Sequence, residues 1–392
     1  MNECPGSRPL TIMLVAGEPS GDQLGAQLMA GLKEAAGERV RIVGVGGSAM
    51  TAEGLTSLFP LDATSVMGLR EVVPRIPAIL RRVRQATDFA VKTRPDLVVL
   101  IDSPDFTHRI AQRLKRIAPS IRTANYAPPQ VWASRSYRAR KMARYMDAVL
   151  TLFPFEAAFF ERHGIRAYPV GYPVIERASR ISGGDEFRRR HGIAADAPLL
   201  AVLPGSRRNE IRFLLPPFKA AVGILARDIP GLVSVLPTVG HVAPLVRAAV
   251  SDWPTPVHVV ETDAEKFAAF DAADAALAAS GTVTSELALA KTPMVVGYRL
   301  GWLTAALARP FIDVPHVVLI NLVLGRQAVP ELLQDACTPE ALARALKPLL
   351  TDETVRAQQL ADLEDAVRAF GVGRESPSLR AARAVLELAG NA

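Results

Sequence analysis

Four short segments of the chain combine chemically useful side chains with a position directly after an apolar run. A turn of Gly, Ser or Pro ends each run, and a helical pattern follows. Such strand–turn–helix junctions bring backbone N–H groups and polar side chains to one edge of a sheet. We therefore expect the functional groups of the protein to lie here. The segments are GEPSGD (17–22), IDSPDF (101–106), LPGSRRNE (203–210) and ASGTVTSE (279–286).

Asp102 ends the apolar run 96–102. A carboxylate at the carboxyl end of a strand, facing a cleft, is well placed to act as a general base. The alternative is that an aspartate of this segment caps the helix that follows, a role that suits Asp105 better than Asp102. We therefore predict that Asp102 is the catalytic residue.

Two of the junctions are suited to phosphate. The glycines of 17–22 let the backbone approach a ligand, and the helix start offers N–H groups to an anion. An ordinary tight turn, capped by Ser20 or Asp22, explains the same residues equally well. In 203–210, Arg207 and Arg208 stand at a helix N-terminus, where the helix dipole disfavours cations unless an anion pairs with them. A diphosphate fits that arrangement, and a solvated arginine pair is the alternative. Neither segment matches a P-loop or a G-x-G-x-x-G fingerprint.

The segment 279–286 has small residues that leave room for a flat or bulky ligand. Glu286, on the first turns of the following helix, is placed to accept hydrogen bonds from ribose hydroxyls; a charge that merely favours the helix dipole is the alternative. The sequence has no Asp-x-Asp pair, and its six histidines lack metal-ligand spacing. We therefore expect a metal-independent reaction without a cofactor, in which arginines neutralise the phosphate charge.

The elements that must position these residues follow an alternating pattern of short apolar runs and helical stretches. This alternation predicts mostly parallel sheets covered on both faces, an α/β fold. A polar stretch at 177–198 divides the 392 residues into two doubly wound halves, with the site expected in the cleft between them. The expected strands are 10–17, 41–47, 96–102, 121–126, 148–154, 199–206, 232–237, 258–261, 275–280 and 293–299. The expected domains are 1–178, 199–320 and a helical segment, 321–392, that packs back on the first domain.

Composition narrows the class of protein. Apolar residues make up 49% and charged residues 22%, which is a globular profile rather than a disordered one. The net charge of +7 indicates an anionic partner. Two cysteines are too few for a disulfide framework, and no apolar run is long enough to span a bilayer. The run 10–17 is read as a buried strand rather than a signal peptide, so we expect a soluble, cytoplasmic protein.

Two regions bear on partners. Residues 66–84 alternate apolar side chains with arginines, as in a helix that lies on an anionic membrane; a core-facing helix is the alternative, and Pro74 and Pro77 argue against one continuous helix. The run 135–145 is basic, but no nucleic-acid-binding motif accompanies it, and a lipid surface or a solvated face explains it as well. The expected membrane-facing residues are Val66, Met67, Leu69, Val72 and Val73.

Taken together, the motifs resemble the lipid-A-disaccharide synthase family of bacterial inverting glycosyltransferases. The resemblance runs from Leu10 to about Leu388, and the order and spacing of its motifs are specific to that family. The motifs are AGEPSGD (16–22), VMGLREVV (66–73), IDSPDF (101–106), PPQVWAS (128–134), LPGSRRNEI (203–211), ASGTVTSELALAKTPMVVGYR (279–299) and NLVLGRQAVPELLQ (321–334).

The resemblance implies a GT-B fold and a defined reaction. It implies transfer of 2,3-diacylglucosamine from UDP to 2,3-diacylglucosamine 1-phosphate, giving a β-1,6-linked disaccharide 1-phosphate and UDP. Asp102 would take the proton of the acceptor 6-hydroxyl, Arg207 would stabilise the departing diphosphate, and Glu286 would hold the ribose. The implied UDP-binding residues are Ser206, Arg207, Arg208, Gly281, Thr282, Glu286, Asn321 and Glu331, and those for the acceptor or its phosphate are Gly17, Glu18, Ser20 and Gly21.

The resemblance also implies partners and a location. The protein would dock as a peripheral protein on the cytoplasmic face of the inner membrane, where acylated substrates reside, and would bind no nucleic acid. A homodimer is left open.

Three positions depart from the family pattern, which usually has Ser at Pro128, Trp at Ser134 and His at Tyr172. They leave two alternatives open: a GT-B glycosyltransferase acting on another acceptor, and a nucleotide-sugar or lipid-surface binding protein without turnover.

Overall fold

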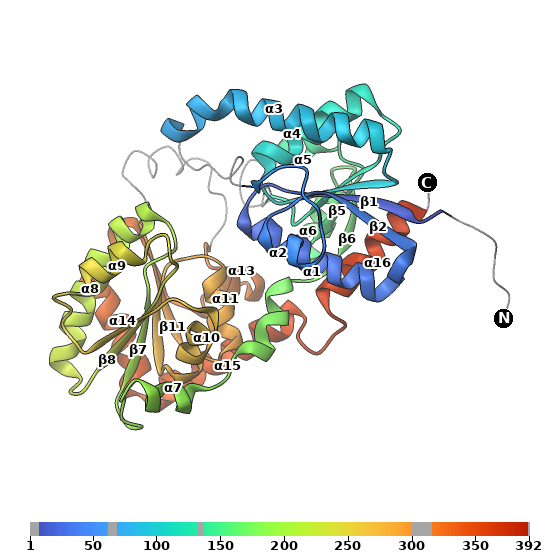
Figure 1. Cartoon of the computed structure of the whole chain (residues 1–392). Coiled ribbons are helices and arrows are strands. Elements are labelled where there is room, and N and C mark those ends of the chain that lie inside the picture. The colour runs from blue at the N-terminus through green and yellow to red at the C-terminus, as the bar shows by residue number, and fades with distance from the viewer. Residues whose placement is uncertain (1–7, 62–68, 130, 132–136, 300–315, 391–392) are drawn as a thin grey trace. The chain divides into compact units, whose positions relative to one another are not determined.

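The computed structural model describes residues 8–61, 69–129, 131, 137–299 and 316–390 (Figure 1). The chain divides into two compact units. Unit 1 consists of residues 1–173 together with 374–392, and unit 2 of residues 174–373. Each unit contains one six-stranded sheet whose strands pair in parallel.

The sheet of unit 1 has the order β2-β1-β3-β4-β5-β6. Its strands are β1 (Leu10–Ala16), β2 (Val40–Val45), β3 (Leu97–Ile101), β4 (Thr123–Tyr126), β5 (Ala148–Thr151) and β6 (Arg166–Pro169). Its helices are α1 (Pro19–Ala36), α2 (Ser48–Ala52), α3 (Leu69–Thr93), α4 (Pro104–Ile117), α5 (Tyr137–Met142), α6 (Pro154–Glu161) and α16 (Pro377–Gly390), with a 3₁₀ turn at Gly37–Arg39.

Alternation along β1 shows why this unit has two apolar layers. Ile12 and Leu14 pack in a cluster with residues of α1 and α16, whereas Met13 and Val15 pack in a second cluster with residues of α3, α4 and α5. Successive side chains of a strand point to opposite faces, so an almost wholly apolar strand must be covered on both. The helices seen on the two sides of the sheet in Figure 1 supply that cover.

The sheet of unit 2 has the order β12-β11-β10-β7-β8-β9. Its strands are β7 (Leu199–Leu203), β8 (Val233–Pro237), β9 (Val257–Val260), β10 (Ala275–Ala278), β11 (Met294–Tyr298) and β12 (Glu331–Leu333). Its helices are α7 (Gly184–Arg190), α8 (Arg208–Asp228), α9 (Ala243–Ala249), α10 (Asp263–Ala272), α11 (Thr282–Leu289), α13 (Leu319–Leu324), α14 (Pro339–Thr351) and α15 (Glu353–Phe370), with 3₁₀ helices at Pro173–Arg180 (η3) and Gln334–Ala336.

Both sheets reverse their strand order at one point, which is where open α/β sheets bind ligands. In unit 1 the reversal lies between β1 and β3, because β2 and β4 extend the sheet in opposite directions from them. In unit 2 it lies between β7 and β10. The four segments singled out from the sequence follow these four strands, so the topology brings them together in two pairs.

The predicted α/β class with two doubly wound parallel sheets is confirmed, and some details differ. The sequence pattern did not indicate β6 or β12. It argued against a continuous helix at Pro74 and Pro77, yet α3 runs through both. The polar stretch 177–198 contains part of η3 and all of α7. Of the segment 321–392, residues up to 373 belong to unit 2, and α16 packs on α1 of unit 1.

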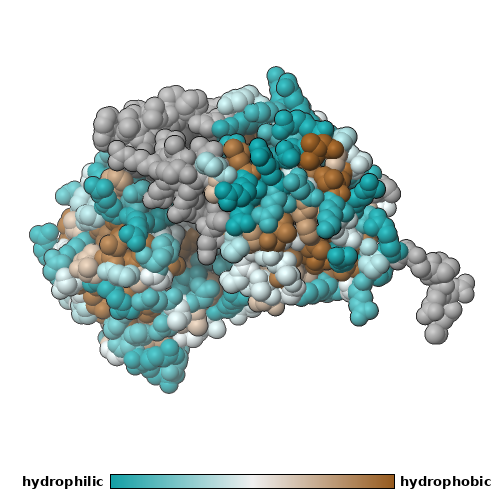
Figure 2. Space-filling model, turned by 45° about the horizontal axis from the view of Figure 1, so that its top comes forward, coloured by the Kyte–Doolittle hydropathy of each residue, from teal (hydrophilic) through white to brown (hydrophobic). Residues whose placement is uncertain are grey.

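No helix among the described residues is long and apolar enough to cross a membrane. The large apolar side chains that these residues expose are scattered over several elements; Leu80 of α3, Phe155 of α6 and Leu245 of α9 are examples. On the face drawn in Figure 2, apolar residues lie between hydrophilic ones.

Candidate active site

Asp102 follows the last residue of β3 and has an unusual backbone. Its φ is +52°, and that of Ser103 is +45°, so two consecutive residues with side chains lie in the left-handed region. Each such residue costs on the order of 1–3 kcal/mol unless its surroundings hold it. Here the Asp102 N–H donates to the Tyr126 carbonyl at 3.2 Å, and the Thr107 hydroxyl donates to the Asp102 carbonyl at 2.7 Å. Backbone strain of this kind concentrates at functional sites.

The Asp102 carboxylate meets the turn that follows β1. The Ser20 hydroxyl donates to Oδ2 of Asp102 at 2.8 Å, and the Ser103 N–H donates to Oδ1 at 2.8 Å. The Ser103 hydroxyl in turn donates to Glu18 Oε1 at 3.2 Å. Two segments that are 82 residues apart in sequence therefore form one cluster at the switch point of unit 1. Asp102 is half-buried, whereas Asp105 is exposed.

Two glycines of that turn allow the close approach. A Cβ on Gly17 would lie 2.6 Å from the Ser103 side chain, and one on Gly21 would lie 3.1 Å from the Ile101 carbonyl. Only residues without side chains let α1 begin this close to the β3–α4 turn. Gly17 and Gly21 thus position Glu18 and Ser20 beside Asp102.

Asp22, the last residue of the same motif, has a structural role. It is buried, and its two carboxylate oxygens accept the N–H groups of Gly47, Ala49 and Met50 at 2.6–3.1 Å. These are N–H groups at the start of α2, which Asp22 caps from another element. The cap residue of α1 is Glu18, without a side-chain cap bond, so neither Ser20 nor Asp22 caps that helix as the alternative interpretation had it.

Unit 2 has a cavity of about 310 Å³ at its own switch point. It lies at the carboxyl ends of the neighbouring strands β10, β7 and β8, and the N-terminal turn of α11 borders it. The cavity brings together five of the residues predicted to bind UDP. Its lining is Leu203, Gly205, Ser206, Arg207, Glu210, Pro237, Thr238, Val239, Lys266, Ala279, Ser280, Gly281, Thr282, Val283 and Glu286.

Glu286 is buried on α11 between two cations. Arg177 of η3 pairs with its Oε1, and Lys266 of α10 lies 3.3 Å from its Oε2. Lys266 also stacks on the Phe267 ring, 4.3 Å from its centroid. The two ion pairs fix the orientation of the carboxylate, whose remaining lone pairs are still able to accept hydroxyl groups.

Arg207 lies at the N-cap of α8, where its charge opposes the helix dipole. The chain compensates with Glu210, whose Oε2 accepts the N–H groups of Ser206 and Arg207 at 3.0 and 3.2 Å and whose Oε1 pairs with the guanidinium at 3.1 Å. Gly205 makes room for this carboxylate, with a φ of +108° and a would-be Cβ 2.4 Å from Glu210 Oε2. The Arg207 side chain remains 56% exposed, so it can turn to another anion.

Sequence reasoning missed Lys266, Arg177 and Thr238. The Thr238 hydroxyl lines the cavity, is buried and has no hydrogen-bond partner among the described residues. Thr238 directly follows β8, so its place at a strand end was the available signal. No local signal marks Lys266 or Arg177, which reach Glu286 from elements distant in sequence.

Three of the residues predicted to bind UDP do not line this cavity. Arg208 borders a different cavity beside α8 and α9. Asn321 and Glu331 bond to each other and to backbone of their own segment: Asn321 Oδ1 accepts the N–H groups of Ala328 and Val329, both at 2.8 Å, and Glu331 Oε2 accepts that of Val317 at 2.8 Å. They hold the chain around β12 together.

Some predicted positions lie outside the described part of the chain. Val66, Met67 and Ser134 fall in the undescribed ranges, and at Leu69, Val72 and Val73 only the backbone of α3 is described. Tyr172 is buried, with its ring 5.3 Å from that of Phe153. Within the described ranges, no three His, Cys, Asp or Glu side chains gather closely enough to hold a metal ion.

Comparison with known proteins gives matches over almost the whole chain. The family model for lipid-A-disaccharide synthetase matches residues 12–383. The lipid-A-disaccharide synthase of Rhodospirillum centenum is 48% identical over 381 residues, 97% of this chain and 95% of that protein. The one of Paramagnetospirillum magneticum is 49% identical over 380 residues, 96% of this chain and 97% of that protein.

Solved structures are similar in fold. The UDP-GlcNAc 2-epimerase of Neisseria meningitidis, bound to UDP-GlcNAc, has a TM-score of 0.63 at 13% identity and covers 96% of this chain and 99% of its own. MurG of Acinetobacter baumannii has a TM-score of 0.58 at 16% identity, covering 97% and 100%. The fold is therefore the GT-B fold that the motifs imply.

Proposed function

The chain belongs to the lipid-A-disaccharide synthetase family, and on that premise we propose the reaction and the residues that perform it. The protein is a glycosyltransferase that joins UDP-2,3-diacylglucosamine to 2,3-diacylglucosamine 1-phosphate and releases UDP. The observation that carries this proposal is the match over 97% of the chain, at 48% identity, to a lipid-A-disaccharide synthase. The family model matches residues 12–383, a range that spans both clusters described above.

The cavity of unit 2 would bind the UDP portion of the donor. Glu286, oriented by Arg177 and Lys266, would accept the ribose hydroxyls. The diphosphate would lie at the N-terminus of α8, where Arg207 exchanges Glu210 for a phosphate oxygen and Lys266 adds a second cation. The buried Thr238 hydroxyl would gain the partner that it lacks. We propose that Ser206, Gly281 and Thr282 complete this site, and that Asn321, Glu331 and Arg208 act outside it.

Asp102 would act as the general base. As the acceptor O6 attacks the anomeric carbon, the O6–C1 bond forms, the bond from C1 to the phosphate oxygen breaks, and the electron pair leaves with UDP. The proton of the hydroxyl passes to Asp102 Oδ2, and attack from the opposite face inverts the anomeric centre. The Ser20 hydroxyl donates a hydrogen bond to Asp102 Oδ2 at 2.8 Å, and the acceptor hydroxyl would bind in its place.

The turn of Gly17, Glu18, Ser20 and Gly21 would hold the acceptor sugar at Asp102. The Glu18 carboxylate and the Ser20 hydroxyl are hydrogen-bonding groups of the kind that sugar hydroxyls require. The acyl chains of both substrates demand a lipid surface, so we propose that the protein works at the cytoplasmic face of the inner membrane through the region 66–84.

An assay with the purified full-length chain tests this proposal. With both acylated substrates and EDTA present, we expect disaccharide 1-phosphate and UDP. Asp102→Asn should lower kcat by at least about 100-fold and leave UDP affinity unchanged, because the base acts only in the transfer step. Asp196→Asn, which changes an exposed carboxylate outside both clusters, is the matched control.

Other outcomes would favour the alternatives. UDP binding without disaccharide would point to another acceptor, in keeping with the departures at Pro128 and Tyr172. Equal kcat for Asp102→Asn and the unmodified chain would refute the role of Asp102. A chain that binds UDP and transfers nothing to any sugar acceptor would be a binding protein.

A further inference from the structure

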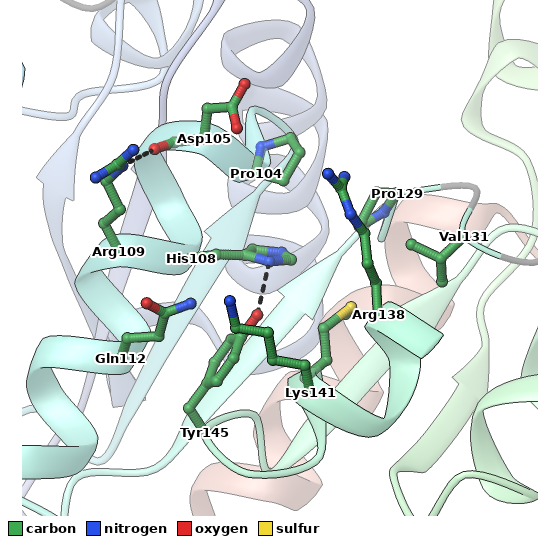
Figure 3. Close-up of a pocket in the computed structure, with 11 residues that line it drawn as sticks. Pro104, Asp105, His108, Arg109, Gln112, Pro129, Val131, Arg138, Lys141 and Tyr145 are labelled. Atoms are coloured by element: carbon green, nitrogen blue, oxygen red, sulfur yellow. Dashed lines mark hydrogen bonds between the residues drawn. The ribbon is translucent and has the colours of Figure 1, made fainter. Parts of the chain in front are cut away.

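Unit 1 has a cavity that plays no part in the reaction as proposed above. It is a cavity of about 320 Å³ between α4 and α5, shown in Figure 3. Its residues come from α4, from the chain that follows β4, and from α5 with the residues after it. The lining is Pro104, Asp105, His108, Arg109, Gln112, Pro129, Val131, Arg138, Lys141, Met142 and Tyr145.

Three cations border this cavity, and none of them has a carboxylate partner among the described residues. Arg138 and Lys141, both on α5, make no side-chain hydrogen bond or ion pair within the described part of the chain. Arg109 of α4 donates only to the Asp105 carbonyl, at 2.8 Å. In Figure 3, Arg138 and Lys141 extend from α5, and Arg109 reaches the Asp105 carbonyl on α4. Asp105 is the one carboxylate in the lining, so cations outnumber it three to one.

Neighbouring cations on the same helix are treated differently. Arg113 of α4 lies 3.6 Å from Asp88, and Lys115 lies 3.1 Å from Asp147. Carboxylates therefore balance these two cations of α4, whereas no ion pair is found for Arg109, Arg138 or Lys141 among the described residues. Cations that converge on a concave surface attract an anion more strongly than dispersed ones.

The floor of the cavity is a neutral hydrogen-bonded chain. The Asn125 amide donates to the Leu100 carbonyl at 2.7 Å, so its oxygen faces His108 Nε2, 3.1 Å away, and accepts that N–H. Nδ1 of His108 then accepts the Tyr145 hydroxyl at 3.2 Å, drawn as a dashed line in Figure 3. Burial, aided by the charge of Arg138, lowers the pKa of His108 below its ordinary value. The positive charge of the cavity therefore resides on the exposed side chains of Arg109, Arg138 and Lys141.

We propose that this cavity binds the phosphate of the sugar acceptor, a proposal that rests on the function proposed above. The first two residues of the lining, Pro104 and Asp105, follow Asp102 by two and three positions. Three residues of chain span at most about 11 Å, so the cavity begins within that distance of the proposed base. The 1-phosphate of the acceptor is carried by C1 and the 6-hydroxyl by the substituent on C5, and C1 and C5 are the two carbons that flank the ring oxygen, so the two groups lie close enough together to reach neighbouring sites. With its hydroxyl at Asp102, the acceptor can direct its phosphate toward Arg138 and Lys141.

The turn at 17–22 is less suited to that phosphate. Two carboxylates, Glu18 and Asp102, lie there, both bonded to Ser103, and a phosphate dianion between them would be repelled. The same carboxylates suit neutral hydroxyl groups. The acceptor therefore has its 6-hydroxyl in the carboxylate cluster and its phosphate in the cationic cavity, and these two anchors fix the orientation of the ring between them.

The double variant Arg138→Ala/Lys141→Ala tests this inference in two ways. In the transfer assay, we expect KM for the phosphorylated acceptor to rise at least tenfold, with KM for the UDP donor unchanged. In a ³¹P NMR titration of the full-length chain with glucosamine 1-phosphate, we expect line broadening by the unmodified protein and its loss in the double variant. The titration requires no turnover, so it decides the inference even if the proposed reaction fails.

Arg140→Ala/Arg144→Ala is the matched control. It removes the same number of charges from the same stretch, at exposed positions that do not line the cavity. It should leave both the KM for the acceptor and the NMR broadening near those of the unmodified chain. Equal effects of the two double variants would mean that the net charge of this stretch, and not the cavity, attracts the phosphate, and would overturn the inference.

Two further arms distinguish the source of the phosphate. If chloride displaced glucosamine 1-phosphate as well as inorganic phosphate does, the cavity would attract anions without selecting a phosphate. If Arg138→Ala/Lys141→Ala weakened sedimentation with phosphatidylglycerol vesicles but left KM for the acceptor unchanged in detergent, the cavity would bind lipid headgroups. Either result would overturn the assignment.

Discussion

At the scale of single residues, Asp102 and Ser103 both have a left-handed backbone conformation, and their side chains bond to the turn that follows β1. A glycine at either position would adopt this conformation at less cost, yet the chain uses two residues with side chains. Both side chains are engaged: Asp102 with Ser20, and Ser103 with Glu18. The strain is therefore offset by the same hydrogen bonds that join the β1 and β3 junctions, and these bonds hold the carboxylate of the proposed base in place.

In the proposed UDP site of unit 2, Glu286 holds the ribose and Arg207 the diphosphate, and two variants test these roles separately. Glu286→Gln should weaken uridine and UDP alike by about tenfold or more, because both carry the ribose and the variant leaves two cations without their carboxylate. Arg207→Ala should weaken UDP and leave uridine unchanged. Isothermal titration of both ligands measures each effect.

The control for these variants is Glu364→Gln, which breaks an exposed ion pair with Lys291 away from the cavity. It should change neither affinity, because exposed pairs contribute little. A loss of UDP affinity in Glu286→Gln without a matching loss for uridine would assign Glu286 to the diphosphate instead of the ribose.

Which residues of the candidate site could be predicted depends on how local their signal is. Asp102, Arg207 and Glu286 stand at strand–turn–helix junctions, and the local pattern marks such positions. Lys266 and Arg177 carry no such mark, because helix packing alone brings them to Glu286. Asn321 and Glu331 illustrate the converse: they belong to a specific motif, yet their side chains are occupied with holding their own segment.

At the scale of elements, Asp22 fixes α2 to α1 and gives a stability prediction. Asp22→Ala would leave the N–H groups of Gly47, Ala49 and Met50 without their acceptor, at a cost of about 2–4 kcal/mol. Hydrogen exchange should quicken at residues 47–52, while UDP affinity stays unchanged. Asp105→Ala serves as control, and protection at 47–52 equal to that of the unmodified chain would show that α2 has another cap.

The buried hydrogen bonds of His108 with Asn125 and Tyr145 predict how the stability of the protein depends on pH. His108 is buried against Asn125 and Tyr145, with Asp105 and Arg138 as the nearby charges, and burial lowers its pKa. The unfolded chain therefore takes up this proton first as pH falls. Stability should be intact above about pH 6.5 and decline below it, by no more than about 1.4 kcal/mol per pH unit for one proton.

The measurement is thermal unfolding of the full chain between pH 5 and pH 8. His108→Gln should flatten the acid decline relative to the unmodified chain, whatever its absolute stability. His258, whose pKa burial also lowers, contributes in the same direction and remains in both proteins. An acid decline of the same steepness in both proteins would exclude His108 as its source.

The strands at the edges of the sheets are the ones that the sequence pattern did not predict. β6 and β12 each lie at the margin of a sheet, and neither strand has a fully buried residue. An apolar run is produced by burial on both faces, as in β1 and β3, so an edge strand lacks the pattern that reveals a central one. α3 presents another limit, since neither Pro74 nor Pro77 interrupts it.

At the scale of the whole molecule, the path of the chain is the least predictable feature. The C-terminal α16 returns to unit 1, where it packs on α1 in the same apolar cluster as β1 and β3. Gly31 of α1 permits this contact, because a Cβ there would lie 2.5 Å from the Ser378 carbonyl. The helical pattern of 377–390 reveals an apolar face and says nothing of which unit covers it.

The net charge of +7 bears on the proposed docking at an anionic membrane, and it gives the last prediction. Vesicles containing phosphatidylglycerol should sediment the protein at 0.1 M NaCl and release much of it at 1 M, because the Debye length falls from about 10 Å to about 3 Å. Arg81 and Arg84 are exposed on α3, next to the exposed Leu80. The double variant Arg81→Glu/Arg84→Glu should weaken vesicle binding at least tenfold. The control is Arg189→Glu/Arg190→Glu on α7, which reverses two exposed charges outside α3. Equal losses of vesicle binding in both double variants would mean that the overall charge of the protein, and not α3, causes the binding.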